Sequence, residues 1–305
     1  MKLTILLVCY DMAREIPRTL QGLSRDYQVG ARELDYEVLL LDNGSPQPLD
    51  ESTWAHVDVP VRVVRLEDAP PSPALAINTG LEQARGEVVC LMIDGAHILT
   101  PGVFRLALAA FEVYGEAVVI TRYFWLGNDA QNVSIMEGYN QDVEDRLLER
   151  IDWPSDGYRL FEIGSPLVTD QENINWMNFM FESNCLFMRR EFFRAMGGAD
   201  ERFDFPGGGF INSDVFKRAV DAPETTAVQL MGEGSFHQVH GGTTTNTTTE
   251  ERDAQLAKYL DQYEALRGDR NILATTRFHF LGHIPTEAAK IHRWKKKKRM
   301  LDGLV

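Results

Sequence analysis

Acidic residues follow three short apolar segments in the first hundred residues of the chain. Asp11 comes after the apolar run that starts at Leu3, Asp42 comes after VLLL, and Asp94 comes after VVCLMI. Carboxylates gathered in one place repel each other unless a cation or a proton donor joins them. A metal-bound diphosphate that carries a sugar and a base would suit such a cluster. These residue types therefore indicate a site for a phosphorylated ligand.

An open, mostly parallel sheet would bring these residues together. Short apolar runs alternate with segments of helical period over roughly the first 120 residues, which predicts strand–helix–strand units. The expected strands span residues 3–8, 37–41, 61–66, 87–93 and 117–121. Ligands bind beyond the carboxyl ends of the strands in such sheets, which is where Asp11, Asp42 and Asp94 lie. The predicted class is α/β, Rossmann-like, with helices flanking the central sheet.

The rest of the chain is less regular. Apolar residues from Val103 to Tyr114 recur at helical spacing after Thr100 and Pro101, which predicts a helix. Between about 127 and 178 no period is sustained, so we expect a loop-rich region that shapes a pocket. Later segments predict a strand and short helix before Gly197, a helix near 212–220, and C-terminal helices that include 256–266.

Composition limits the classes of function. The chain has 305 residues, of which 44% are hydrophobic and 25% are charged, enough for one large α/β domain with or without an appendage. A net charge of -14 disfavours nucleic acid as a partner. The apolar runs are far shorter than the roughly 20 residues that cross a bilayer. The N-terminal run lacks a cleavage site and predicts a strand rather than a signal peptide, so we expect a cytoplasmic protein.

Five segments, in order, resemble the family-2 glycosyltransferases of GT-A fold. They are VCYDMAREIPRTLQGL, VLLLDNGS, NTGLEQARGEVVCLMIDGAH, GGADERF and SDVFKR. The resemblance implies transfer of a sugar from a nucleotide-sugar, with UDP favoured, to a glycan or lipid-linked acceptor, with inversion, as in polysaccharide biosynthesis. It divides the chain into a GT-A domain over 1–245, with a nucleotide-binding half (1–125) and an acceptor half (126–245), and a helical extension with a basic tail over 246–305.

The same resemblance assigns residues to the donor site. Tyr10 and Asp11 would border the nucleotide entrance, and Asp42 would accept a hydrogen bond from the base. Asp94 would begin the Asp-x-Asp metal motif of the family. The full donor set that it implies is Tyr10, Asp11, Asp42, Asn78, Gly80, Asp94 and Gly95.

The metal motif is incomplete, because Ala96 stands where the second carboxylate is expected. Mg²⁺ and Mn²⁺ prefer oxygen ligands, and Mn²⁺ also accepts imidazole. We therefore expect Asp94 and His240 to hold Mn²⁺ or Mg²⁺ together with diphosphate oxygens, with His97 and His237 as further candidates. The alternative is that a metal is not required and that these histidines are core or surface residues.

The acceptor half contains a candidate base and a candidate pocket wall. By the resemblance, Asp214 occupies the place of the catalytic carboxylate, with Arg218 following at the expected spacing; alternatively Asp214 caps the helix that starts near residue 212. Glu182 and Asn184 are polar residues between the aromatic-rich WMNFMF and the apolar CLFM, which favours a role at the acceptor.

Other interpretations remain open at this point. The basic stretch IHRWKKKKRM suits the anionic inner face of a membrane, where the protein would bind peripherally, or it is a solvated tail. A non-catalytic module that binds nucleotide-sugars or glycans would explain Ala96. A sugar-1-phosphate nucleotidylyltransferase is less favoured, since VCYDMAREIP lacks the glycine-rich loop that such enzymes need after the first strand.

Overall fold

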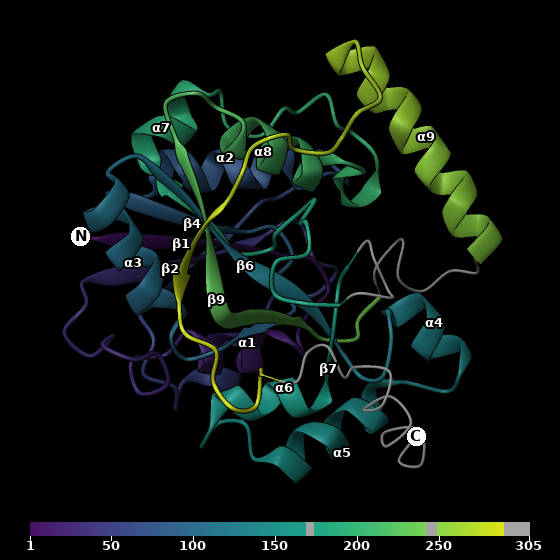
Figure 1. Ribbon diagram of the computed structural model, residues 1–305. Helices are drawn as coiled ribbons and strands as arrows, with labels where there is room; N and C mark the ends of the chain where they lie inside the picture. Colours follow the sequence, from purple (N-terminus) through teal and green to yellow (C-terminus); the bar gives the residue numbers. More distant parts are fainter. Residues whose placement is uncertain (169–173, 242–248, 290–305) are drawn as a thin grey trace.

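The computed structural model describes residues 1–168, 174–241 and 249–289. A ten-stranded mixed sheet crosses the protein, with helices packed on both faces (Figure 1). The strand order along its main path is β10-β9-β6-β8-β4-β1-β2-β3, while β5 pairs with β9 and β7 pairs with β6. This architecture confirms the predicted α/β class.

All five strands expected from the sequence are present. They are β1 (Leu3–Cys9), β2 (Tyr36–Asp42), β3 (Val61–Arg65), β4 (Val88–Met92) and β6 (Ala117–Leu126). The others are β5 (His97–Leu99), β7 (Gly164–Pro166), β8 (Leu186–Arg189), β9 (Thr226–His237) and β10 (His279–Gly282). Because β1 runs parallel to β2 and β4, the residues that follow these three strands meet at one edge of the sheet.

Helices connect and cover these strands. The α-helices are α1 (Ile16–Gly22), α2 (Ala74–Gln83), α3 (Val103–Tyr114), α4 (Gln131–Met136), α5 (Gln141–Ile151), α6 (Leu160–Ile163), α7 (Arg190–Ala195), α8 (Ile211–Val220) and α9 (Thr249–Arg267). Short 3-10 turns lie at Glu51–Trp54, Gly157–Arg159 and Pro206–Gly208. Helix α3 matches the period read from the sequence.

The core lies on both faces of the sheet. Side chains of β1 alternate between them: Ile5 and Leu7 join the apolar cluster under α1 and α3, while Leu6 joins the cluster under α2 and α8. Burying one such side chain contributes about 1.5–3 kcal/mol. The continuous apolar run of β1 therefore fits a strand covered on both sides.

The segment between residues 127 and 178 contains more helix than expected. Helix α5 buries Val143, Leu147, Leu148 and Ile151 on one face, and the Asn140 side chain caps it by accepting from the Val143 N–H. This face packs into a third apolar cluster with aromatic residues of β6 and β9. The helical period was present in DVEDRLLERI, but acidic and basic residues on the opposite face obscured it.

The C-terminal segment differs from a purely helical extension. Helix α9 is found where the sequence predicted it, but β10 then pairs in parallel with β9 and forms one edge of the sheet. The basic stretch near residues 291–300 lies outside the described residues. Within the described part of the chain, no helix combines the length and apolar character needed to cross a membrane.

Asp214 connects α8 to α9. Its side chain is fully buried, and both carboxylate oxygens are ion-paired: Oδ1 with Arg267 Nε at 2.6 Å and Oδ2 with Arg218 Nε at 2.8 Å. Arg218 also donates to the carbonyl oxygens of Met196 and Gly198, which follow α7. These bonds tie three helices together through one carboxylate.

We expect Asp214→Asn to lower the free energy of unfolding by about 3 kcal/mol, since it leaves two arginines facing a neutral amide. Chemical denaturation measures this change. The matched control is Asp261→Asn, which breaks an exposed pair with Arg270 and should cost under about 1 kcal/mol. Equal stabilities of the two variants would contradict this role of Asp214.

Candidate functional site

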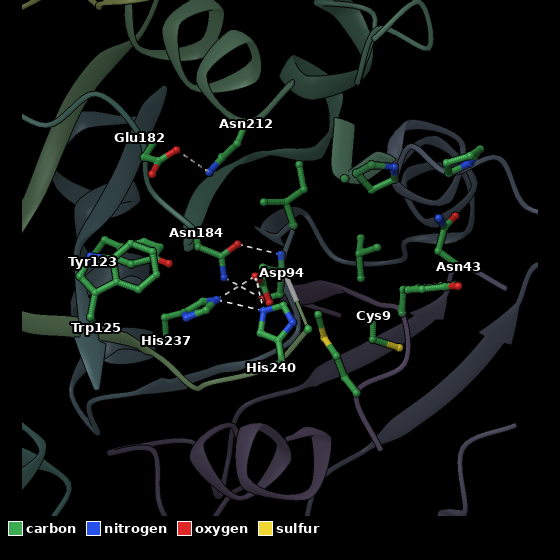
Figure 2. Close-up of a pocket in the computed structure, with 18 residues that line it drawn as sticks. Cys9, Asn43, Asp94, Tyr123, Trp125, Glu182, Asn184, Asn212, His237 and His240 are labelled. Carbon is green, nitrogen blue, oxygen red and sulfur yellow. Dashed lines mark hydrogen bonds and ion pairs between the residues drawn. The ribbon is translucent and has the colours of Figure 1, made fainter. Parts of the chain in front are cut away.

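A pocket of about 330 Å³ opens where β1, β2 and β4 end. Asn43 follows β2 and Asp94 follows β4, while Tyr123 and Trp125 of β6 form an aromatic wall (Figure 2). The lining residues are Val8, Cys9, Tyr10, Met12, Asn43, Pro71, Pro73, Ile93, Asp94, Tyr123, Trp125, Glu182, Asn184, Gly207, Asn212, His237, His240 and Gly241.

Asp94, His237 and His240 converge in this pocket. Oδ2 of Asp94 lies 3.1 Å from Nε2 of each histidine, and the two Nε2 atoms are 3.0 Å apart. Oδ1 of Asp94 accepts from the Ala96 N–H at 2.9 Å, which turns Oδ2 toward the imidazoles. In the described part of the chain, this is the one group of three such ligand atoms close enough to share an ion.

The donor set fits a divalent cation. Adjacent ligands of an octahedral ion at about 2.0–2.2 Å lie about 3 Å apart, which matches all three distances between the ligand atoms. The Nε2···Nε2 distance of 3.0 Å lets the two rings share either a proton, in an N–H···N hydrogen bond, or a cation. One carboxylate and two imidazoles suit Mn²⁺ better than Mg²⁺, because Mg²⁺ prefers an all-oxygen shell.

Electrostatics keep Asp94 ionised. Burial acts to raise its pKa, but the adjacent His240 and His237 hold the pKa of Asp94 well below its usual value. Burial lowers the pKa of His237, which favours the neutral ring that can ligate a metal. The site therefore presents one charged oxygen and an imidazole lone pair.

Other segments fix the positions of Asp94 and of the residue next to His240. The Asn184 amide accepts from the Asp94 N–H and donates to the Asp94 carbonyl oxygen, both at 2.8 Å. Glu144 of α5 accepts from the Val239 N–H at 2.7 Å, and Arg14 donates to the Val239 carbonyl oxygen. Asn184 thereby holds Asp94 at the end of β4, and Glu144 holds the residue next to His240.

His97 lies behind the ligand group. It is fully buried, its Nδ1 faces Ser235 Oγ at 2.7 Å, and its ring packs edge-on against His237 at 4.9 Å. Strand pairing places His97 directly opposite His237. Of the candidate histidines, the structure thus brings His237 and His240 to Asp94 and leaves His97 supporting them.

Asp42 lies outside the pocket lining and is bonded within the scaffold. It is 1% exposed, its Oδ2 pairs with Arg65 at 2.7 Å, and its Oδ1 accepts from the Ser45 N–H. The next residue, Asn43, lines the pocket instead. Its Nδ2 donates to the carbonyl oxygens of Pro70 and Ser72, while its buried Oδ1 has no partner among the described residues.

The remaining donor candidates separate into two groups. Tyr10 lines the pocket and is 54% exposed, and Asp11 follows it at the strand end with its N–H bonded to Ser45 Oγ. Asn78 instead hydrogen-bonds to Ala199 outside the pocket lining. Gly80 and Gly95 are packed against neighbouring strands: a Cβ would lie 2.5 Å from Leu41 Cδ1 at Gly80 and 2.7 Å from the Val8 carbonyl oxygen at Gly95.

The candidates of the acceptor half also separate. Glu182 and Asn184 line the pocket, and Asn212 donates to Glu182 Oε2 at 3.4 Å. Asp214 is two residues further along α8 and faces Arg218 and Arg267 instead. Its buried ion pairs do not support the expected role of Asp214 as general base, because a base must reach the acceptor hydroxyl.

Several pocket residues were not assigned to the site from the sequence, and the polar and aromatic ones are Asn43, Tyr123, Trp125 and Asn212. Asn43 directly follows Asp42 at the end of β2, so its place at a strand end could have indicated a pocket residue. Tyr123 and Trp125 alternate along a strand and must share a face, which the aromatic run RYFW also indicated. Asn212 carried no signal of its own, because its place depends on how α8 packs.

Comparisons with known proteins agree with this geometry. The family described as Glycosyl transferase family 2 matches residues 4–196. The structure of S. aureus TarS (residues 1–349) in complex with UDP is 13% identical, with a TM-score of 0.50 over 87% of this chain and 72% of that chain. The structure of the same protein in complex with UDP-GlcNAc is 14% identical, with a TM-score of 0.50 over 87% of this chain and 73% of that chain. GalNAc-T7 with UDP, GalNAc and Mn²⁺ is 15% identical, with a TM-score of 0.50 over 98% of this chain and 54% of that chain. No curated protein matches significantly. The structural likenesses show a shared GT-A fold.

We expect Asp94→Ala, His237→Ala and His240→Ala each to weaken Mn²⁺ binding at least about tenfold, because each removes one of three converging ligands. Calorimetric titration of Mn²⁺ in the presence of UDP measures the affinity. His56→Ala, an exposed histidine outside the pocket, is the matched control. Unchanged affinity in both pocket histidine variants would show that these residues do not hold the metal.

Proposed function

This chain belongs to glycosyl transferase family 2, and we propose that it transfers a sugar from a UDP-sugar to a glycan or lipid-linked acceptor with inversion at the anomeric carbon. The observation that carries the proposal is the order of groups along the pocket. The ligand group Asp94, His237 and His240 lies between Asn43 on one side and Glu182 with Asn212 on the other (Figure 2). A nucleotide, a diphosphate and a sugar follow each other in the same order along a donor.

The ligand group would bind the diphosphate through a divalent cation. When bound, such a cation neutralises the negative charge that develops on the leaving diphosphate. Mn²⁺ is our first choice because imidazole contributes two of the three ligand atoms, and GalNAc-T7 was solved with Mn²⁺ and UDP.

Asn43 would read the base. Its amide is oriented by the carbonyl oxygens of Pro70 and Ser72, and its Oδ1 is a buried acceptor with no partner among the described residues, which a small side-chain movement would turn toward a base. Uracil carries an N3–H donor, whereas cytosine has an acceptor at that atom. The complexes of TarS with UDP and UDP-GlcNAc also favour uridine nucleotides for this fold.

The sugar would lie against Tyr123 and Trp125, whose rings meet edge to face at 4.7 Å. Aromatic faces of this kind provide apolar contact area for the C–H groups of a sugar ring. The basic C-terminal stretch of the sequence would let a cytoplasmic enzyme reach lipid-linked acceptors at the inner membrane face.

A donor panel tests the proposed function. We expect the protein to release nucleoside diphosphate from UDP-glucose or UDP-GlcNAc faster than from GDP-mannose or dTDP-glucose, in the presence of Mn²⁺. Asp94→Ala should reduce this release by at least about a hundredfold, since it removes the charged metal ligand. Coupled detection of released UDP measures both rates. No release from any donor, with or without Mn²⁺, would contradict the proposal.

We expect Asn43→Ala to weaken UDP binding by up to about tenfold, the value of one neutral hydrogen bond, and to remove the preference for UDP over CDP. Calorimetry with both nucleotides measures this preference. Asn271→Ala, a surface asparagine, is the control. If Asn43→Ala keeps the preference of the unsubstituted protein, another group recognises the base.

A further inference from the structure

We propose that Glu182 is the general base that accepts the proton of the acceptor hydroxyl during sugar transfer. This inference rests on the proposed function and adds the residue that acts on the acceptor side of the same pocket. The proposed proton acceptor is therefore in the segment just before β8, whereas the sequence suggested Asp214 on α8.

The position of Glu182 suits an attack on the far side of the sugar from the diphosphate. Glu182 lines the pocket on the side of Asp94 opposite Asn43, next to Asn212 (Figure 2). It is two residues from Asn184, a separation of at most about 7 Å between Cα atoms. Because the Asn184 amide is bonded to the Asp94 backbone, Glu182 is held at a short, defined span from the metal ligand.

Glu182 is also the carboxylate that remains available. Among the described residues that line the pocket, the acidic ones are Asp94 and Glu182. Asp94 faces two imidazoles with Oδ2 and bonds the Ala96 N–H with Oδ1. The Asp214 oxygens are bonded to Arg218 and Arg267. Among the described residues, Glu182 accepts one long hydrogen bond, from the Asn212 amide to Oε2 at 3.4 Å.

The surroundings of Glu182 favour proton transfer near neutral pH. Burial raises the pKa of Glu182 to about 7, although the positive charge of Arg252 on α9 and the Asn212 amide act to lower it. The Tyr123 hydroxyl on β6 faces the same region, and burial raises its pKa well above the usual value, so it stays neutral. A base with a pKa near the working pH combines a deprotonated ground state with useful basicity.

Asn212 would position the carboxylate rather than take the proton. Its amide nitrogen donates to Glu182 Oε2 and has no basic lone pair, so it cannot act as the proton acceptor itself. This bond orients Glu182 through Oε2 and would leave Oε1 for the acceptor hydroxyl. Asn212 is therefore a positioning residue.

The acceptor oxygen forms a bond to the anomeric carbon while its proton passes to the Glu182 carboxylate, which becomes a neutral carboxylic acid. The bond between the anomeric carbon and the diphosphate oxygen breaks, and its electron pair leaves with UDP. Glu182 then releases the proton to solvent. Attack opposite the diphosphate inverts the anomeric carbon.

Donor hydrolysis tests this role, with UDP-GlcNAc and UDP-glucose as probes and water as the acceptor. We expect Glu182→Gln to lower turnover by about 10²–10⁴-fold, the usual contribution of a general base, with UDP and Mn²⁺ affinities within threefold of the unsubstituted protein. The isosteric amide can still accept from Asn212, so the fold should be kept. Glu201→Gln, an exposed glutamate outside the pocket, should retain full turnover.

The pH profile separates a base from a structural role. Turnover of the unsubstituted protein should fall as pH drops below about 7, because Glu182 becomes protonated, and this acidic limb should be absent from the residual activity of Glu182→Gln. Glu182→Asp should keep the limb at reduced turnover. Formate added to Glu182→Ala should restore part of the activity by supplying a free carboxylate.

The outcomes are distinguishable. No UDP release by the unsubstituted protein would overturn the proposed function, and the role of Glu182 with it. UDP release that survives Glu182→Gln, or that is lost together with UDP affinity, would overturn the role of Glu182 alone. Proton NMR of the first product formed from the α-linked donors should show the β-anomer, and an α-anomer would exclude a simple general base.

Discussion

Asp94 is held at both its backbone and its side chain by residues from other segments of the chain, and the site depends on these contacts. The Asn184 amide pairs with the Asp94 backbone N–H and carbonyl oxygen, which joins the end of β4 to the segment before β8. Its carboxylate meets His237 and His240 at the end of β9. One residue therefore connects three strand ends, and the pocket takes its shape around that point.

Three aspartates of this chain differ in function because their partners differ. Asp42 and Asp214 face guanidinium groups, which carry a permanent charge and no lone pair, so these carboxylates are neutralised within the scaffold. Asp94 faces imidazoles, which keep a lone pair when neutral and can share a cation with it. The identity of the basic partner thus separates structural acids from an acid that can bind a metal.

Both halves of the chain contribute to the pocket in a way that suits a two-substrate reaction. The ends of β1, β2 and β4 form the side where Asn43 lies, and segments around β8 and α8 bring Glu182 and Asn212 to the other side. Helix α5, which lies in a region without an obvious pattern, adds Glu144 and so fixes the backbone next to His240. The second half of the chain therefore supplies both groups that line the pocket and a group that fixes the backbone beside His240.

The sequence by itself determined the strands of the first half, the class of fold and the position of Asp94, because these follow from local apolar runs and from the polar residues at their ends. It also named His240 and His237 as candidates, because Ala96 leaves the metal motif incomplete and FHQVHGG offers two imidazoles later in the chain. Only the tertiary structure decided which carboxylates are neutralised by an arginine. Asp214 pairs with Arg267, which is 53 residues away in the sequence. Asp42 pairs with Arg65, which is 23 residues away. Such pairings depend on the packing of distant segments, to which local pattern gives no access.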